Sequence, residues 1–332
     1  MRKLKKSVKD NNNNHWWMSI EKVFAGIDLK GLKVVCPQCN ETGLVTTRWI
    51  KGPALKPIYI LHIKLRKVIK VCELTEEQSK DVRGKVSIVE NDIKKFLETK
   101  KSFILFSGGN DSIATLMYLK GIADKFKSVL TAIYVDTTAG LSANTKYVKK
   151  VCKYLGVNLK IVRPKIDYFT LAKEWGIPSF KYRWCCRELK IKPIKEYLDK
   201  IKEPKVVFDG IRAAESNIRK QYIPIWYHPG FKCLSVSPIF YWSNEEVISY
   251  VNSNGIPKTS LHSLGTSAEC WCGAYKTKSD FEKLYDLDRK MFSKLDEVER
   301  KNKSGYTFIY ENGQRISLSD IVKELKKKVK KA

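Results

Sequence analysis

The stretch Phe103-Ile-Leu-Phe106-Ser107-Gly108-Gly109-Asn110-Asp111-Ser112 decides the fold of this chain. Its first four residues form a short apolar run, which is typical of a buried strand, and residues 112–126 have helical periodicity. Glycines between a strand and a helix let backbone N–H groups approach phosphate oxygens, and the helix N-terminus adds donors and a favourable dipole. An ordinary glycine-rich turn with Ser and Asp capping the helix is the alternative. The position after the first strand favours phosphate binding.

An alternation of strands and helices continues beyond this loop. We expect further strands at residues 130–135, 159–162, 206–209 and 234–236, and helices at 144–155, 168–175, 186–201 and 243–252. Such alternation predicts a doubly wound parallel α/β sheet, with ligands at the carboxyl edge of its strands.

Each side chain of the loop has a predicted part in nucleotide binding. Ser107 and Ser112 offer hydroxyl groups to phosphate, and the backbone of residues 108–110 offers N–H donors. The carboxylate of Asp111 repels phosphate, so we expect it to hold a bridging Mg²⁺. Asp136, at the end of the second strand, is a candidate ribose or metal ligand, and a helix cap is an equal alternative.

The loop also resembles the Ser-Gly-Gly-x-Asp-Ser signature of PP-loop ATP pyrophosphatases. Downstream, over about residues 100–275, the chain resembles the phosphoadenosine phosphosulfate (PAPS) reductase family of that superfamily. Four segments carry this resemblance. They are 184–193 (Trp-Cys-Cys-Arg-Glu-Leu-Lys-Ile-Lys-Pro), 210–219 (Gly-Ile-Arg-Ala-Ala-Glu-Ser-Asn-Ile-Arg), 238–247 (Pro-Ile-Phe-Tyr-Trp-Ser-Asn-Glu-Glu-Val), and Ile256-Pro257, Leu261-His262, Gly265 and Cys270.

The resemblance implies a Rossmann-like PP-loop enzyme that binds ATP or a related adenine nucleotide. Gly210, Arg212 and Arg219 follow the fourth strand, and the two guanidinium groups suit bidentate contact with phosphate or sulfate. Glu215 could orient one of them, although a surface ion-pair cluster is the alternative. The predicted nucleotide-binding residues are Ser107, Gly108, Gly109, Asn110, Asp111, Ser112, Asp136, Gly210 and Arg212. The predicted catalytic residues are Asp111, Arg212, Arg219 and Cys272.

The nine cysteines are clustered, and no export signal precedes them, which favours metal or redox chemistry over disulfides. Cys185 and Cys186 form one pair, and Cys270 and Cys272 a second, as is typical of soft-metal ligands. Iron-bearing members of the resembled family hold a 4Fe–4S cluster on Cys-Cys and Cys-x-x-Cys. The resemblance therefore implies such a cluster here. Its ligation by three or by four cysteines stays open, because one residue separates the second pair, and reduced thiols are the alternative.

Cys36-x-x-Cys39 precedes two β-rich stretches, 44–50 and 58–71, and His62 and Cys72 follow at ribbon-like distances. These four residues predict a zinc ribbon with tetrahedral Cys₃His coordination. The expected organisation is a disordered basic tail (1–15), a zinc-ribbon-like module (16–75), a helical linker (76–99), a PP-loop domain (100–279) and a helical basic C-terminal tail (280–332).

The 332 residues carry 63 Lys and Arg against 35 Asp and Glu, a formal net charge of +28. This excess favours a polyanionic partner such as tRNA or another nucleic acid. A lysine-rich surface of the thermophile kind is the alternative. Neither a signal core nor an apolar run of about 20 residues occurs, so we expect a cytoplasmic protein without membrane contact.

Two features separate the possible functions. The resembled reductases attack the sulfonucleotide with a mobile C-terminal cysteine, but the sequence has no cysteine after Cys272, and Asp111 preserves the ATP-pyrophosphatase form of the loop. We therefore expect ATP-dependent adenylation and sulfur transfer to a nucleic-acid acceptor, with a thiol or sulfur-donor protein as partner. The alternatives are a reductase that releases sulfite from PAPS or adenosine phosphosulfate, and a non-catalytic nucleic-acid-binding protein.

Overall fold

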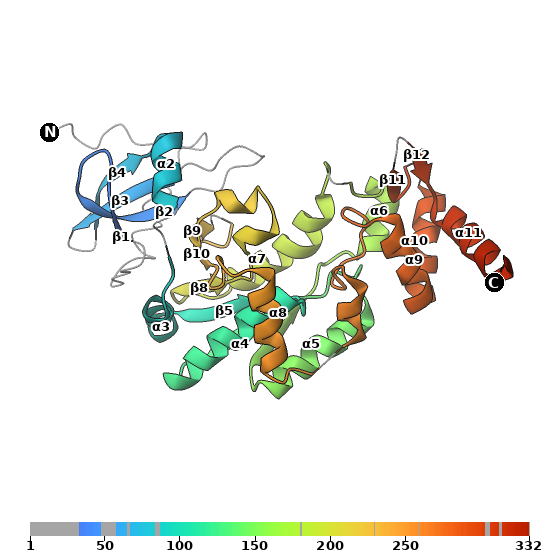
Figure 1. Cartoon of the computed structure of the whole chain (residues 1–332), viewed down its shortest axis with the longest axis horizontal. Helices are drawn as coiled ribbons and strands as arrows, with labels where there is room; N and C mark the ends of the chain where they lie inside the picture. The colour runs from blue at the N-terminus through green and yellow to red at the C-terminus, as the bar shows by residue number, and fades with distance from the viewer. Residues whose placement is uncertain are drawn as a thin grey trace.

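The computed structural model describes residues 33–47, 58–64, 67–83, 87–179, 181–228, 230–257, 259–302, 306–311 and 314–331. The predicted tail 1–15 lies outside the described residues. A four-stranded sheet lies at one end of the long axis and the last helices at the other, with a six-stranded sheet between them (Figure 1).

The six-stranded sheet has the order β7-β6-β5-β8-β10-β9. Five of its strands are parallel, and β9 pairs antiparallel with β10 at the edge. The strands are β5 (Lys101–Leu105), β6 (Leu130–Val135), β7 (Asn158–Val162), β8 (Lys205–Phe208), β9 (Ile225–His228) and β10 (Cys233–Val236). The predicted doubly wound parallel α/β sheet is confirmed, and β9 is an addition that the sequence pattern did not predict.

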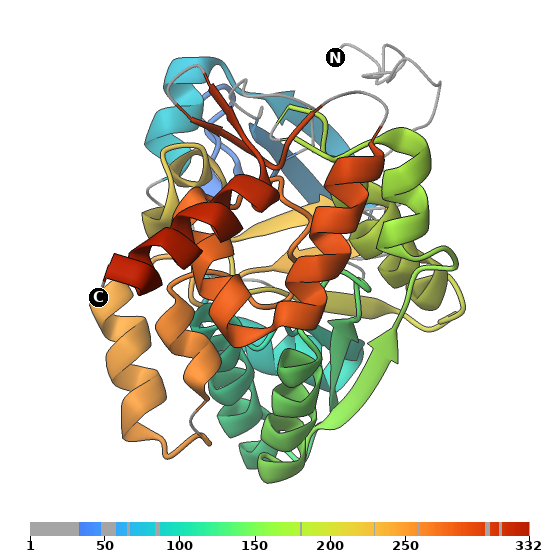
Figure 2. The same cartoon turned by 90° about the vertical axis from the view of Figure 1, so that its right-hand side faces the viewer.

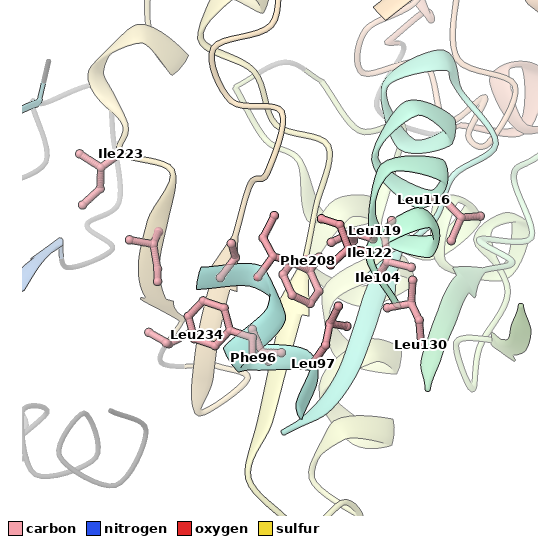
Figure 3. Close-up of a cluster of buried hydrophobic side chains, with 14 of the residues drawn as sticks. Phe96, Leu97, Ile104, Leu116, Leu119, Ile122, Leu130, Phe208, Ile223 and Leu234 are labelled. Carbon is pink, nitrogen blue, oxygen red and sulfur yellow. The ribbon is translucent and has the colours of Figure 1, made fainter. Parts of the chain in front are cut away.

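Alternating side chains of the central strands give the sheet two buried faces. Phe96, Leu97, Leu116 and Leu119 pack with Ile104 and Phe208 on one face (Figure 3). The neighbours Phe103 and Val207 point to the other face, where Ile194 and Leu198 cover them. The helices that supply or flank this packing are α3 (Glu90–Thr99), α4 (Asn110–Lys125), α5 (Ser142–Tyr154), α6 (Tyr168–Trp175), α7 (Lys192–Leu198) and α8 (Asn244–Ser253).

Residues 186–201, expected as one helix, divide into two elements. The first, η2 (Cys186–Ile191), is a π-helix, and α7 follows it directly. The Lys192 N–H bonds to the carbonyl of Arg187, five residues earlier, and Pro193 has no N–H to donate. The π-helical turn therefore begins within the Cys185–Cys186 pair. Short 3₁₀ turns occur at η3 (Ala213–Glu215), η4 (Arg219–Gln221) and η5 (Ser260–Leu264).

The N-terminal sheet is antiparallel in the order β1-β2-β3-β4. Its strands are β1 (Lys33–Val35), β2 (Thr42–Thr47), β3 (Ile58–Lys64) and β4 (Lys67–Glu73), and α2 (Glu76–Arg83) follows. β2 packs against β9, and Val45 and Ile60 belong to the same buried cluster as Ile225 and Tyr227. The module therefore shares a core with the edge of the large sheet.

The C-terminal region contains three helices and a hairpin, whereas only helical sequence was expected for 280–332. The elements are α9 (Lys278–Leu287), α10 (Arg289–Lys301), β11 (Ile309–Glu311), β12 (Gln314–Ile316) and α11 (Leu318–Lys331). The Glu299 carboxylate accepts hydrogen bonds from the N–H groups of Phe308 and Leu318 at 2.8 and 2.6 Å, which holds both ends of the hairpin. Figure 2 shows α10 and α11 in front of the sheet.

None of the helices in the described ranges combines the length and the apolar character that crossing a bilayer requires.

Candidate nucleotide site and cysteine clusters

The loop between β5 and α4 is held by its own serines. The hydroxyl oxygens of Ser107 and Ser112 lie 3.1 Å apart, and Ser112 donates to the carbonyl of Gly109 at 2.8 Å. The N–H of Gly109, the residue that precedes α4, donates to the Ser107 hydroxyl at 3.3 Å. Gly108 has φ +83, a backbone conformation that side chains disfavour. These contacts bring together the predicted phosphate-binding loop, residues 107–112, and the N-terminus of α4.

Two residues from distant segments support the loop, and the sequence reasoning assigned a role to neither. Asn144 of α5 donates its side-chain amide to the Ser107 carbonyl at 3.0 Å and to the Tyr134 hydroxyl at 3.2 Å. The Nε2 atom of His262 lies 3.1 Å from the Gly108 carbonyl oxygen. Asn144 is 3% exposed, but burial is a property of the folded chain, so the sequence held no signal that singled this residue out.

Gly210 brings the segment after β8 directly against the loop. A Cβ at this position would stand 3.0 Å from the carbonyl carbon of Asp111 and 3.2 Å from the nitrogen of Ser112. Both are backbone atoms, so a side chain at this position would require the loop backbone to shift by a few tenths of an ångström.

Arg212 is fixed by three protein partners and is 4% exposed. Its Nε donates to Asp111 at 2.8 Å, and its two terminal nitrogens donate to the Trp242 carbonyl at 3.1 Å and to Asn244 at 2.9 Å. Since a guanidinium has five N–H groups, two remain for a ligand. Arg219 forms an ion pair with Glu215, and burial lowers the pKa of Arg219.

Asp209, which the sequence reasoning missed, orders the start of this segment. Its buried carboxylate accepts hydrogen bonds from Ser235 at 2.7 Å, from Ser237 at 2.6 Å and from the N–H of Ile211 at 3.1 Å. Burial raises the pKa of Asp209, and the two serines oppose that effect. The carboxylate thus ties β8 and β10 to the turn that carries Gly210 and Arg212.

Two cavities meet at the phosphate loop. The first, of about 580 Å³, has Leu105, Ile133 and Val135 in its apolar wall, and cationic groups from Arg183, Lys190 and Arg219. The second, of about 650 Å³, is lined by Gly108, Gly109, Asn110, Arg212 and His262 among others. Both cavities share Ser107, Asp111, Ser112 and Glu215.

The structure does not bring Asp136 to the described lining of either cavity. Its carboxylate accepts hydrogen bonds from Arg163 Nε at 3.0 Å and from the N–H of Thr138 at 3.1 Å. These two neighbours hold the strand-end carboxylate, and its predicted roles as a ribose or metal ligand or as a helix cap stay predictions.

The four cysteines of the two pairs gather beside the first cavity. The sulfur atoms of Cys185 and Cys272 lie 3.3 Å apart, and further hydrogen bonds join Cys185 to Cys186 and Cys270 to Cys272. Thiolates are ligands that soft metals prefer, but among the described residues only the set in the N-terminal module has donor atoms that all lie within 4.8 Å of one another. The hydrogen bond with Cys185 raises the pKa of Cys272 to about 12, so as a free thiol this residue is a poor nucleophile.

An ion pair connects the cysteines to the first cavity. Lys190 of η2 donates to the Glu269 carboxylate at 2.5 Å, and both residues line that cavity. Glu269 directly precedes Cys270, and Lys190 lies four residues after Cys186. The hydrogen bond from Cys185 lowers the pKa of Cys186, and the nearby Lys190 ammonium acts in the same direction.

A second set of donor atoms converges in the N-terminal module. One ligand atom from each of Cys36, Cys39, His62 and Cys72 lies within 4.8 Å of the other three. The arrangement could hold a metal ion. The structure thus brings together the four residues that the sequence singled out, including the two that follow the Cys-x-x-Cys motif.

Comparisons with known proteins address the larger domain. The sequence profile of the phosphoadenosine phosphosulfate reductase domain matches residues 101–277, more than half of the chain. The uncharacterized protein MJ0973 of Methanocaldococcus jannaschii is 31% identical over 215 residues, which are 62% of this chain and 50% of the relative. Adenosine 5'-phosphosulfate reductase of Lysinibacillus sphaericus is 26% identical over 147 residues, or 43% of this chain and 62% of the relative.

The chain thus spans half to less than two thirds of these relatives. Among solved structures, the phosphate complex of PAPS reductase from Candida auris is 18% identical, with a TM-score of 0.44, and covers 60% of this chain and 97% of its own.

The strand-loop-helix cradle, the glycine that faces it and the buried arginine all lie within the segment that the family profile matches. The chain is therefore an enzyme of the PP-loop type and belongs to the phosphoadenosine phosphosulfate reductase family.

Proposed function

We propose that the chain cleaves ATP, or a related adenine nucleotide, between its α- and β-phosphates. The adenylate group that results activates an acceptor for sulfur transfer. An acceptor oxygen attacks the α-phosphorus and pyrophosphate leaves. Sulfur at the hydrosulfide level then displaces AMP from the acceptor, so no external oxidant or reductant is needed. The observation that carries this proposal is the set of four residues that both cavities share.

The pyrophosphate end of the nucleotide suits the second cavity. Backbone N–H groups of residues 108–110, the start of α4 and the side chains of Arg212 and His262 line it. Helix N-termini and glycine-rich backbones are established anion-binding features. Developing charge on the leaving pyrophosphate would meet these fixed donors.

The adenosine end suits the first cavity, where Leu105, Ile133 and Val135 provide an apolar wall at the ends of β5 and β6. The α-phosphate then lies at the junction, beside Ser107, Asp111 and Ser112. Carboxylate and hydroxyl oxygens are ligands that Mg²⁺ accepts, so these residues fit a magnesium ion. Bound there, the ion would neutralise charge on the phosphates.

The acceptor and the sulfur donor approach from the side of the Lys190–Glu269 ion pair in this proposal. The four cysteines adjoin that pair and would hold an iron–sulfur group; ligation by three of them would leave one iron able to bind sulfide. A nucleic acid is the acceptor class that the net charge of +28 favours, because a small substrate needs only local positive charge.

Reduction of a sulfonucleotide to sulfite is the second candidate function. Similarity to adenosine 5'-phosphosulfate reductases and the location of the cysteines beside the first cavity favour it. The raised pKa of Cys272 weighs against that residue as the attacking thiol.

The test uses the full chain, purified without oxygen, with three substrates. We expect pyrophosphate and AMP from Mg²⁺-ATP in the presence of tRNA and a hydrosulfide donor, and no sulfite from PAPS or adenosine phosphosulfate. Asp111→Asn should abolish most of this turnover, whereas Cys152→Ala, in a buried position of α5 away from both cavities, serves as the matched control. Sulfite release without pyrophosphate formation would replace the proposal with the second candidate.

A further inference from the structure

The Cys36–Cys39 turn is shaped to direct two sulfur atoms inward. The Cys36 carbonyl accepts hydrogen bonds from the N–H groups of Cys39 and Asn40 at 3.3 and 2.8 Å, and the Cys36 N–H donates to the Glu41 carbonyl at 2.9 Å. Asn40 has φ 56, in the left-handed region that Asn tolerates. This tight turn joins β1 to β2.

The other two donors come from the neighbouring strands β3 and β4. His62 lies on β3 and Cys72 on β4, within a paired hairpin, so their separation is fixed by backbone hydrogen bonds. The His62 Nε2 atom lies 3.4 Å from the Cys39 sulfur and 3.6 Å from the Cys72 sulfur. Two side chains from the β1–β2 turn and two from β3 and β4 thus bring their donor atoms within 4.8 Å of one another.

The environment of His62 is that of a metal ligand. The residue is 3% exposed, and its Nδ1 atom is buried without a hydrogen bond, 3.7 Å from the Glu41 carboxylate. Metal-bound histidines commonly direct their second ring nitrogen toward a carboxylate, which orients the ring and raises its basicity. Three sulfur donors and one imidazole match the ligand set of structural zinc sites.

The module reaches the first cavity through β9. Along this strand, Ile225 and Tyr227 are buried in the cluster that contains Val45 of β2, whereas the alternate residues Trp226 and His228 line the cavity. Side chains of a strand alternate between its two faces. β9 therefore has the module on one face and the cavity on the other.

We propose that Cys36, Cys39, His62 and Cys72 hold one zinc ion in tetrahedral coordination, and that this ion keeps β9 in place as a wall of the first cavity. The ion ties the turn before β2 to β3 and β4, and β2 in turn packs against β9. This inference does not depend on which reaction the chain catalyses.

The first experiment measures metal content and coordination in the full chain. We expect one zinc per chain, retained in Cys185→Ser, and a cobalt-substituted protein with tetrahedral thiolate spectra. His62→Ala should lose the metal, whereas His62→Cys, which restores four ligands, should retain it. Cys152→Ala is the matched control for removal of a buried thiol. Zinc that remains in both His62→Ala and Cys72→Ser would overturn the assignment.

The second experiment measures amide hydrogen exchange after zinc has been removed with a chelator. Protection should fall in β1–β4 and in residues 225–228 of β9, and it should persist in β5 and β6. Adding zinc alone should restore it. Unchanged protection of β9 in the zinc-free protein would overturn the proposed support of the cavity wall, even if the metal site itself is correct. Exchange requires no catalytic activity, so failure of the proposed reaction would not affect this result.

Discussion

Arg212 and Asp111 form a hydrogen-bonded ion pair of 2.8 Å between residues 101 positions apart in the sequence. The pair joins the start of α4 to the segment that follows β8. Because the guanidinium also donates to Trp242 and Asn244, the Asp111 carboxylate is held in one orientation at the junction of the two cavities.

Arg212→Lys should lower nucleotide turnover by about 10²-fold, the usual cost of losing one positioned donor in an active site. A lysine has no planar fork and cannot bond to all three partners. Steady-state kinetics measures the effect. Arg163→Lys is the control, because Arg163 is exposed and pairs with Asp136 away from both cavities. Equal kcat/KM in the parent and Arg212→Lys would remove the pair from the mechanism.

Gly210→Ala and Gly109→Ala form a matched pair with different expected effects. A Cβ at 210 meets loop backbone at 3.0 Å, so we expect a loss of about 1–3 kcal/mol in unfolding free energy. A Cβ at 109 has only the Ser107 hydroxyl nearby, at 3.6 Å, and φ −81 suits any residue. Gly109→Ala should therefore fold normally. It should bind nucleotide less well, because the added methyl group hinders the approach of the loop backbone to phosphate. Thermal denaturation and nucleotide titration separate the two, and equal melting temperatures would contradict this view of Gly210.

Cys185→Ser should remove most of the iron from protein purified or reconstituted without oxygen. The Cys185 sulfur lies 3.3 Å from that of Cys272. Its loss removes one of the four proposed sulfur ligands of the iron. Iron analysis and the visible absorption spectrum measure the outcome, with Cys152→Ala as the control. Iron-free parent protein after reconstitution would show that these four residues are ordinary thiols.

Binding to tRNA should depend steeply on salt if a nucleic acid is the acceptor. Each phosphate contact contributes about 0.9 to the log–log salt slope for duplex. Lys326→Gln together with Lys327→Gln, both exposed on α11, should lower this slope if the helix touches the nucleic acid, with ATP cleavage unchanged. Affinity weaker than micromolar at low salt would exclude a nucleic-acid acceptor.

Local patterns predicted the parts of the site that lie close together in sequence. The apolar run before Ser107 and the glycines after it required no distant contact, so the strand, the loop and the helix were predictable. The Cys₃His set was predictable because a hairpin brings His62 and Cys72 together. β9 (Ile225–His228) was missed because the strand is only four residues long. Its side chains are apolar or aromatic on both faces of the strand.

Contacts between distant segments set the limit of that reasoning. Asn144 and His262 reach the loop from 37 and 154 residues away, and no spacing in the sequence encodes those distances. The prediction for Asp136 relied on its place at a strand end, and the sequence pattern did not indicate that Arg163, the residue after β7, donates a hydrogen bond to its carboxylate. The role of a side chain at a strand end depends on which residues the fold places beside it. The linear sequence pattern does not specify those neighbours.

The contact between His262 and Gly108 has a consequence for biosynthesis. The strand, turn and helix of the cradle emerge from the ribosome early, yet their last support is encoded 154 residues later. Parallel sheets with such distant pairings have high contact order and fold slowly. The nascent chain therefore carries the sequence of the phosphate loop before it carries the histidine that supports that loop, and we expect the loop to reach its final geometry only after residue 262 has been synthesised.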